Sequence, residues 1–99
     1  MFTIEYKEEV TRGLKGLPAY LRREILDKIE EQLGHEPARK TRNRKPLVDL
    51  VPPWEQEGLV WELRIGEYRA FYEVDETADR VVVHAVRHKP PYRKTEEIL

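Results

Sequence analysis

Apolar and polar residues alternate along two short stretches in the second half of the chain, and this period of two is typical of β-strands. The first stretch covers 59–65 and the second 68–74, with Gly66-Glu67 between them. Glycine is favoured at the first central position of a two-residue turn, so the stretches are predicted to form a β-hairpin. One face of this hairpin carries only apolar and aromatic residues and is expected to face the core: Trp61, Leu63, Ile65, Tyr68, Ala70 and Tyr72.

The first half of the chain is predicted to contain one strand and two helices. Residues 2–6 alternate between apolar and polar side chains, which indicates a short opening strand. Apolar residues with helical spacing follow, first over about 7–15 and then over 18–34, where they recur every four residues. Pro18 suits the first turn of the second helix, and Gly34 suits the position just after its end.

Two further stretches are predicted to be strands. Residues 47–51 are mostly apolar and stop at Pro52-Pro53, whereas 81–86 is apolar on both sides, which is typical of a central strand. The basic segment 35–46 has no periodicity and is predicted to be a connection. The resulting order is β-α-α-β-β-β. It predicts a single α+β domain over 1–99, with two N-terminal helices packed on a mainly antiparallel sheet.

The charge of the chain is balanced in total but unevenly distributed. Lysine and arginine number 18 against 19 acidic residues, a formal net charge of −1, which argues against general attraction to nucleic acid. Over 39–45, however, five basic residues occur without an acidic one. Such a stretch is either an ordinary solvated loop or a contact for an RNA backbone. Its predicted RNA-binding residues are Arg39, Lys40, Arg42, Arg44 and Lys45.

Composition also excludes several kinds of site. The chain has no cysteine, which excludes a disulfide, a thiol nucleophile and a cysteine-ligated metal. Its carboxylates are scattered, so we expect neither a metal site nor a cofactor. No apolar run approaches the roughly 20 residues of a membrane span, and the start of the chain lacks a signal-peptide pattern. A cytoplasmic protein without a membrane partner is therefore expected.

The polar face of the hairpin gives the strongest indication of function. Arg64 lies directly opposite Arg69 in the predicted register, and like charges in that position destabilise a sheet. An anion between the two guanidinium groups removes this penalty, so the face is expected to bind phosphate. The alternative is a solvated face on which neighbouring glutamates form weak ion pairs with the arginines.

The strand over 81–86 is expected to return antiparallel to the hairpin. Residues that follow it then lie near the arginine pair, and they are Arg87, His88, Lys89 and Tyr92. Cations stabilise a pentacoordinate phosphorane, and His or Tyr can transfer a proton, so this set suits phosphodiester chemistry. His88 and Tyr92 can equally be surface residues without a catalytic role. The pattern does not fix whether His84 or His88 faces Arg69.

Five segments follow one another in a pattern that resembles the RelE/ParE toxin superfamily of type II toxin–antitoxin systems. They are Lys45-Pro46-Leu47, Trp61-Glu62-Leu63-Arg64-Ile65-Gly66-Glu67-Tyr68-Arg69, Tyr72-Glu73-Val74-Asp75, Val86-Arg87-His88-Lys89 and Tyr92. The resemblance in element order covers nearly the whole chain. The Leu-Arg-Ile-Gly-Glu-Tyr-Arg core is its most specific part.

This resemblance implies both an activity and a set of site residues. The ribonuclease members are similar to a small microbial RNase, enter the ribosomal decoding site and cut mRNA through attack of a ribose 2′-OH on the adjacent phosphate. By the resemblance, Arg69 matches the arginine that contacts the scissile phosphate, and Tyr92 matches the tyrosine just beyond the last strand. The implied catalytic set is Arg64, Arg69, His88, Lys89 and Tyr92, with Arg87 among the RNA-binding residues.

Three activities remain open. The first is a ribosome-dependent, metal-independent mRNA endoribonuclease that inhibits translation, with the ribosome and mRNA as partners. The second is a non-enzymatic inhibitor of DNA gyrase, like the ParE branch; Glu62, which stands where some ribonuclease members have lysine, favours it. The third is a non-toxic binding module of the same fold. For the first two, the implied partner is a cognate antitoxin that lays a helix or an extended strand over the basic groove.

Overall fold

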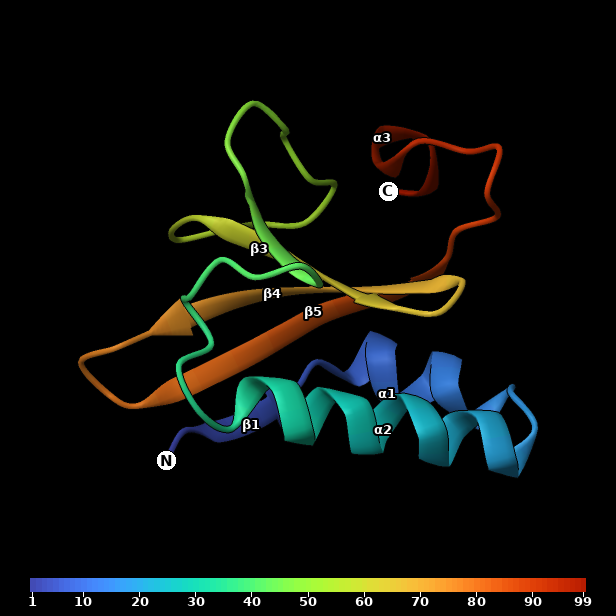
Figure 1. Cartoon of the computed structure of the whole chain (residues 1–99), viewed down its shortest axis with the longest axis horizontal. Helices are drawn as coiled ribbons and strands as arrows, with labels where there is room; N and C mark the ends of the chain where they lie inside the picture. The colour runs from blue at the N-terminus through green and yellow to red at the C-terminus, as the bar shows by residue number, and fades with distance from the viewer.

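The computed structural model describes residues 1–99 as a five-stranded sheet with helices on both faces (Figure 1). Its elements are β1 (Thr3–Tyr6), α1 (Glu8–Lys15), α2 (Ala19–Leu33), β2 (Arg44–Leu47), β3 (Val60–Ile65), β4 (Tyr68–Asp75), β5 (Arg80–His88) and α3 (Thr95–Ile98). The strand order is β1-β5-β4-β3-β2, and all neighbours are antiparallel except β1 and β5. The predicted α+β class and element order are confirmed, with α3 added at the end.

Helices α1 and α2 lie side by side on one face of the sheet (Figure 1). Ile25, Ile29 and Leu33 of α2 are fully buried, because their spacing of four residues places them on one side of the helix. Val10 and Leu14 of α1 join them in the main core cluster. Both helices begin and end within about one residue of their predicted bounds. No helix of the structure combines the length and the apolar character needed to cross a bilayer.

The β3–β4 hairpin forms in the predicted register. Arg64 pairs with Arg69, and Gly66 in the turn has φ +56°, a conformation that favours glycine. Of the six residues predicted to face the core, five are buried, and the sixth, Tyr68, packs partly buried against the same cluster. The predicted central position of 81–86 is also confirmed, since β5 lies between β1 and β4.

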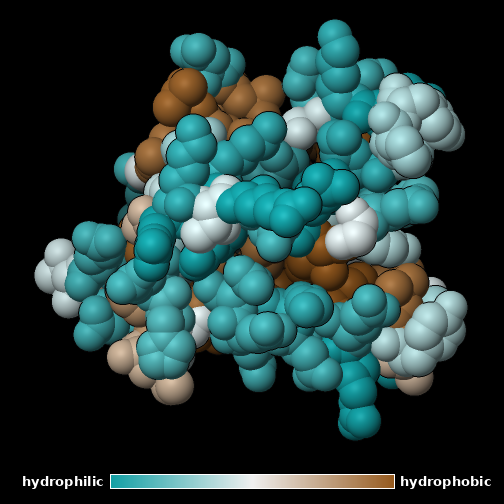
Figure 2. All heavy atoms as spheres, in the orientation of Figure 1, coloured by the Kyte–Doolittle hydropathy of each residue, from teal (hydrophilic) through white to brown (hydrophobic).

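The strand predicted over 47–51 is wrong. The structure instead has β2, which pairs antiparallel with β3 and ends at Leu47. Val48 and Val51 lie in the loop that joins β2 to β3 and are 76% and 89% exposed. Figure 2 shows hydrophobic side chains on the surface of this loop. Residues 44–46 were predicted to belong to a connection, but they form β2, an edge strand in which Pro46 is tolerated.

The C-terminal segment folds back over the other face of the sheet. Ile98 and Leu99 pack against a smaller core cluster of Val60, Phe71 and Ala85. As a result, α3 covers part of the face opposite α1 and α2 (Figure 1). This is the face that carries the predicted arginine pair.

Candidate functional site

Three arginines lie in a row across the sheet, near the turn of the hairpin. Arg64 of β3 pairs with Arg69 of β4, and Arg69 pairs in turn with Arg87 of β5. Residues directly opposite one another in antiparallel strands share a face. We call Arg64, Arg69 and Arg87 the arginine row. Its outer member, Arg87, also reaches Glu9 of α1, with Nη2 and Oε1 3.1 Å apart.

Arg69 is held in place from several sides. Its Nη1 donates hydrogen bonds to the backbone oxygens of Gly66 and Tyr68, each at 2.8 Å. Its Nε lies 3.9 Å from Oε2 of Glu62, and the side chain is 12% exposed. Burial lowers the pKa of Arg69, Glu62 raises it, and Arg64 lowers it. Because the ordinary pKa of arginine lies far above neutrality, Arg69 stays charged at pH 7 and offers a fixed cation.

A buried carboxylate lies on the same face as the arginine row. Glu62 is two residues before Arg64 on β3 and is 4% exposed. Its Oε2 accepts a hydrogen bond from Oγ1 of Thr95 at 2.7 Å, and its Oε1 lies 3.6 Å from Nζ of Lys45. This acid therefore has basic side chains on both sides.

The sequence left open whether His84 or His88 faces Arg69, and in the structure His88 does not share the face of Arg69. It pairs with Tyr68, one residue away from the arginine row, and the two rings lie 5.2 Å apart. Its Nε2 lies 3.1 Å from Oε1 of Glu67. Because successive residues of a strand face opposite sides, His88 is on the face that carries α1 and α2.

A β-bulge in the β4–β5 pairing explains this placement. Phe71 pairs with Ala85 but Tyr72 pairs with Val83, so His84 has no direct partner. The extra residue reverses the alternation of β5, so that Arg87 rather than His88 shares the face of Arg69. No sequence signal marks the bulge, because this strand is apolar on both sides.

His84 also lies away from Arg69. Its Nε2 is 2.7 Å from Oε2 of Glu73, and its ring stacks on Trp54 with the centroids 5.4 Å apart. Glu73 accepts two further hydrogen bonds, from the backbone N–H groups of Glu57 and Gly58. The pair of His84 and Glu73 lies toward the far end of β4. Neither histidine is therefore positioned beside Arg69.

Lys89 and Tyr92 follow β5 at the end of the sheet where the arginine row lies. The backbone N–H of Lys89 donates to the carbonyl oxygen of Glu67 at 2.6 Å, which ties this segment to the hairpin turn. Tyr92 is 79% exposed, and the guanidinium carbon of Arg93 lies 5.7 Å from its ring centroid. Tyr92 is therefore accessible to a ligand, whereas Lys89 is partly exposed. Arg93 was not among the predicted site residues.

Arg44 corrects the prediction for the basic stretch. It is 8% exposed, and its Nη1 donates to the backbone oxygens of Gln32 and Glu36 at 2.8 and 3.0 Å. Its guanidinium thus satisfies carbonyl groups at the end of α2 rather than meeting a ligand. The other four basic residues of the stretch are exposed, as expected: Arg39, Lys40, Arg42 and Lys45.

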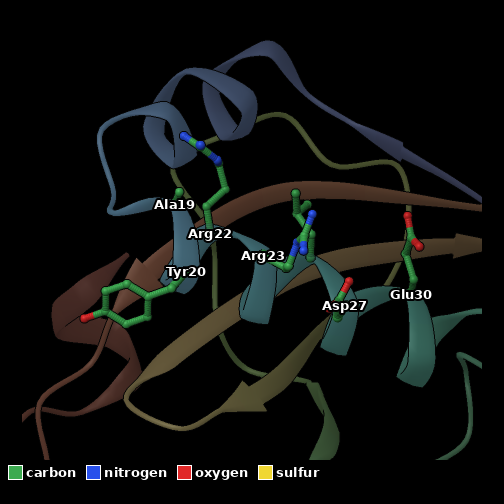
Figure 3. Close-up of a pocket in the computed structure, with 7 residues that line it drawn as sticks. Ala19, Tyr20, Arg22, Arg23, Asp27 and Glu30 are labelled. Carbon is green, nitrogen blue, oxygen red and sulfur yellow. The ribbon is translucent and has the colours of Figure 1, made fainter.

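Two surface hollows lie away from the arginine row. Figure 3 shows one along α2, lined by apolar, acidic and basic side chains together: Ala19, Tyr20, Arg22, Arg23, Leu26, Asp27 and Glu30. A second lies toward the far end of the sheet and is lined by six carboxylates against Lys7, Arg80 and His84. The carboxylates of that groove repel a phosphate, whereas the guanidinium groups of the arginine row attract one.

Comparison with known proteins identifies the family. The family model described as the ParE toxin of the type II toxin–antitoxin system parDE matches residues 4–89. The chain belongs to the RelE/ParE toxin superfamily. No curated protein matches it in sequence.

Solved structures of RelE proteins share the fold of this toxin. The RelBE2 toxin–antitoxin complex from Mycobacterium tuberculosis gives a TM-score of 0.71 at 25% identity, over 89% of this chain and 91% of that chain. The archaeal RelE–RelB complex from Pyrococcus horikoshii gives 0.68 at 22% identity, over 94% and 98%. The isolated Escherichia coli RelE toxin gives 0.65 at 18% identity, over 96% and 89%. These matches confirm the predicted RelE-like fold.

Proposed function

We propose that this toxin is a ribosome-dependent endoribonuclease that cuts mRNA without a metal ion and so inhibits translation. The arginine row is the observation that carries the proposal. A phosphodiester gains negative charge as it becomes a pentacoordinate phosphorane. Fixed cations that are already in place stabilise this state more than the ground state.

In the proposed reaction a ribose 2′-oxygen attacks the adjacent phosphorus atom. The O2′–P bond forms while the P–O5′ bond breaks, which leaves a 2′,3′-cyclic phosphate and a 5′-hydroxyl. A base takes the proton of the 2′-hydroxyl, and an acid supplies one to the departing 5′-oxygen. We assign these transfers to Lys89 and Tyr92, on the segment that follows β5. His88 faces the other side of the sheet, so it takes part only if that segment rearranges.

Other exposed groups extend this surface toward a longer strand of RNA. Lys45 pairs with Glu62 across β2 and β3, directly beside the arginine-bearing face. Arg39, Lys40 and Arg42 continue the positive charge along the preceding loop and are proposed to contact the RNA backbone. The exposed ring of Tyr92 offers a surface on which a base can stack.

A RelB-like antitoxin is the proposed partner. The similar structures from M. tuberculosis and P. horikoshii are toxin–antitoxin complexes, which supports such a partner for this chain. We expect an antitoxin helix or strand to cover Arg69 through acidic and apolar contacts. A complex that leaves both Arg69 and Tyr92 open to solvent contradicts this mode of inhibition.

The activity can be tested in a reconstituted translation system with one defined mRNA. Wild-type protein is expected to produce fragments that end in a 2′,3′-cyclic phosphate, whereas Arg69→Ala leaves the mRNA whole. Arg80→Ala is the matched control, because Arg80 lies on the same sheet but pairs with Glu5 and Asp75 at the far end. Intact mRNA in the presence of folded wild-type protein contradicts the proposal.

Inhibition of DNA gyrase is the second candidate function. The family model carries the ParE description, and Glu62 places a negative charge on the face where the ribonuclease proposal needs phosphate. Supercoiling of relaxed plasmid by purified gyrase separates the two activities. A ribonuclease leaves supercoiling unchanged, and a protein inactive in both assays is the non-toxic binding module.

A further inference from the structure

We propose that Glu62 is a positioning residue for Arg69, and that through Thr95 it joins the arginine row to the C-terminal helix α3. This inference rests on the proposed function, because it concerns the geometry of the phosphate site. Of Glu62, Thr95 and Arg69, only Arg69 is expected to touch the RNA phosphate. Glu62 and Thr95 act through it.

The burial of Glu62 is the first argument. Its direct cross-strand partner on β4 is Phe71, which belongs to the apolar cluster that Ile98 and Leu99 cover. An apolar residue at position 62 would extend this cluster. A buried carboxylate instead carries a large desolvation penalty, which only well-placed partners offset. An acid in this place therefore calls for an explanation other than stability.

The division of contacts between the two carboxylate oxygens is the second argument. Oε2 accepts the hydrogen bond of Thr95 and faces Nε of Arg69, 3.9 Å away. Oε1 faces Nζ of Lys45. One oxygen atom is thus shared between α3 and the arginine row, so a movement of either changes the surroundings of the other.

The position of Arg69 is fixed as a result. Glu62 lies beside Nε, and the backbone oxygens of Gly66 and Tyr68 hold Nη1. The two hydrogen bonds at Nη1 hold one edge of the planar guanidinium, while the charge of Glu62, 3.9 Å from Nε and beyond hydrogen-bond distance, attracts the Nε edge. Its remaining nitrogen, Nη2, has no hydrogen-bond partner in the protein and is the donor left for a phosphate oxygen. Groups that orient a binding residue in this way often matter as much as the residue itself.

Thr95 is itself held firmly at the start of α3. Glu97 accepts a hydrogen bond from the backbone N–H of Lys94 at 2.9 Å and pairs with Arg93 at 3.2 Å. These contacts lower the pKa of Glu97, the backbone hydrogen bond most of all. With Ile98 and Leu99 anchored on the sheet, the hydroxyl of Thr95 has a defined place above Glu62.

The charge of Glu62 gives the proposal a distinctive consequence. A carboxylate near the phosphate opposes RNA binding, while its hold on Arg69 favours the reaction. Glu62→Gln keeps an oxygen that can accept from Thr95 but removes the charge. We expect this variant to bind a short single-stranded RNA about threefold more tightly at low salt, with a steeper salt dependence, while its maximal cleavage rate falls about tenfold. General unfolding cannot produce these opposite changes.

Thr95 provides the second pair of variants. Thr95→Val keeps the shape but removes the donor, and we expect a fall in maximal cleavage rate of about threefold to tenfold with little change in RNA affinity. Thr95→Ser restores the hydroxyl and is expected to restore the rate. Glu5→Gln is the matched control, since Glu5 pairs with Arg80 at the far end of the sheet. Affinity and rate that match wild type in Glu62→Gln overturn the proposal, as does a parallel loss of affinity, rate and thermal stability.

One measurement does not depend on catalysis. The ¹H–¹⁵N signal of Nε in Arg69 is expected to be resolved in the wild type and to shift in both Glu62→Gln and Thr95→Val, but not in Glu5→Gln. An unchanged signal in Thr95→Val overturns the link to α3. If wild-type protein leaves mRNA whole, the ribonuclease proposal fails, whereas this signal and the RNA affinities still decide the role of Glu62.

Discussion

The two ends of the sheet use charge in different ways. At the far end of β4, the carboxylate of Glu73 lies 2.7 Å from His84 and accepts two backbone hydrogen bonds, so the protein itself satisfies its charge. At the other end the arginine row sets three cations side by side, with Glu62 near Arg69 and Glu9 paired with Arg87, so that three positive charges meet two negative ones. A binding site is thus better recognised by charge that the protein leaves unbalanced than by the number of charges.

The largest expected effect is on the rate of mRNA cleavage and comes from removing Arg69 from the arginine row. Arg69→Ala removes the central cation, and we expect the rate of mRNA cleavage to fall by about 10²- to 10³-fold, as for loss of a donor to a transition-state oxyanion. Single-turnover cleavage of a defined mRNA on ribosomes measures this. Arg80→Ala should stay within about twofold of wild type. A loss of less than about tenfold in Arg69→Ala contradicts a central role for this residue.

The opposite outcome is expected at the far end. Glu73→Ala leaves His84 and two backbone N–H groups without their acceptor, which we expect to cost about 3 kcal/mol in the free energy of unfolding. Urea denaturation measures this loss. The cleavage rate of the folded fraction should remain that of wild type. A reduced rate without a loss of stability would place function at this end instead.

Arg44 allows a comparison between arginines, because it is buried and bonds backbone oxygens, whereas Arg69 is proposed to bind phosphate. Arg44→Met removes the donor to two carbonyl oxygens near the end of α2 while keeping an apolar side chain of similar length, and we expect a loss of about 2 kcal/mol in the free energy of unfolding. RNA affinity should not change, because Arg44 is buried. A weaker affinity at unchanged stability would restore the sequence-based interpretation of Arg44 as an RNA contact.

The smallest effect is expected from the exposed basic loop. Lys40→Ala and Arg42→Ala each remove one contact to the RNA backbone, and each should lower the slope of log affinity against log salt concentration by about 0.7. The maximal cleavage rate should be unaffected. Fluorescence anisotropy with a short single-stranded RNA at several salt concentrations gives the slopes. Slopes equal to that of wild type mark this stretch as an ordinary solvated loop.

The predictions from sequence succeeded where one strong local constraint acts. Gly66 fixes the hairpin turn, and the apolar residues of β3 and β4 occupy a single face. Turn and alternation therefore specify the same register, and Arg64 meets Arg69 as predicted. The helices were predictable for the same reason, because α2 repeats its buried residues every four positions.

The remaining features depend on tertiary contacts that leave no local pattern. The bulge at His84 decides that Arg87 and not His88 joins Arg69, yet a strand apolar on both sides gives no alternation by which to detect it. Arg44 looks like its exposed neighbours until α2 ends beside it. The hydrogen bond between Thr95 and Glu62 joins residues 33 positions apart, so only the folded chain reveals it.

The central claim is that Arg64 and Arg69 hold the same RNA phosphate. A double-mutant cycle tests it most directly, through the affinity of wild type, Arg64→Ala, Arg69→Ala and the double variant for one short single-stranded RNA. If the two guanidinium groups share a phosphate, the double variant loses less binding free energy than the sum of the two single losses, by more than about 0.5 kcal/mol. Strictly additive losses would show that the two arginines bind independently, and would contradict the claim.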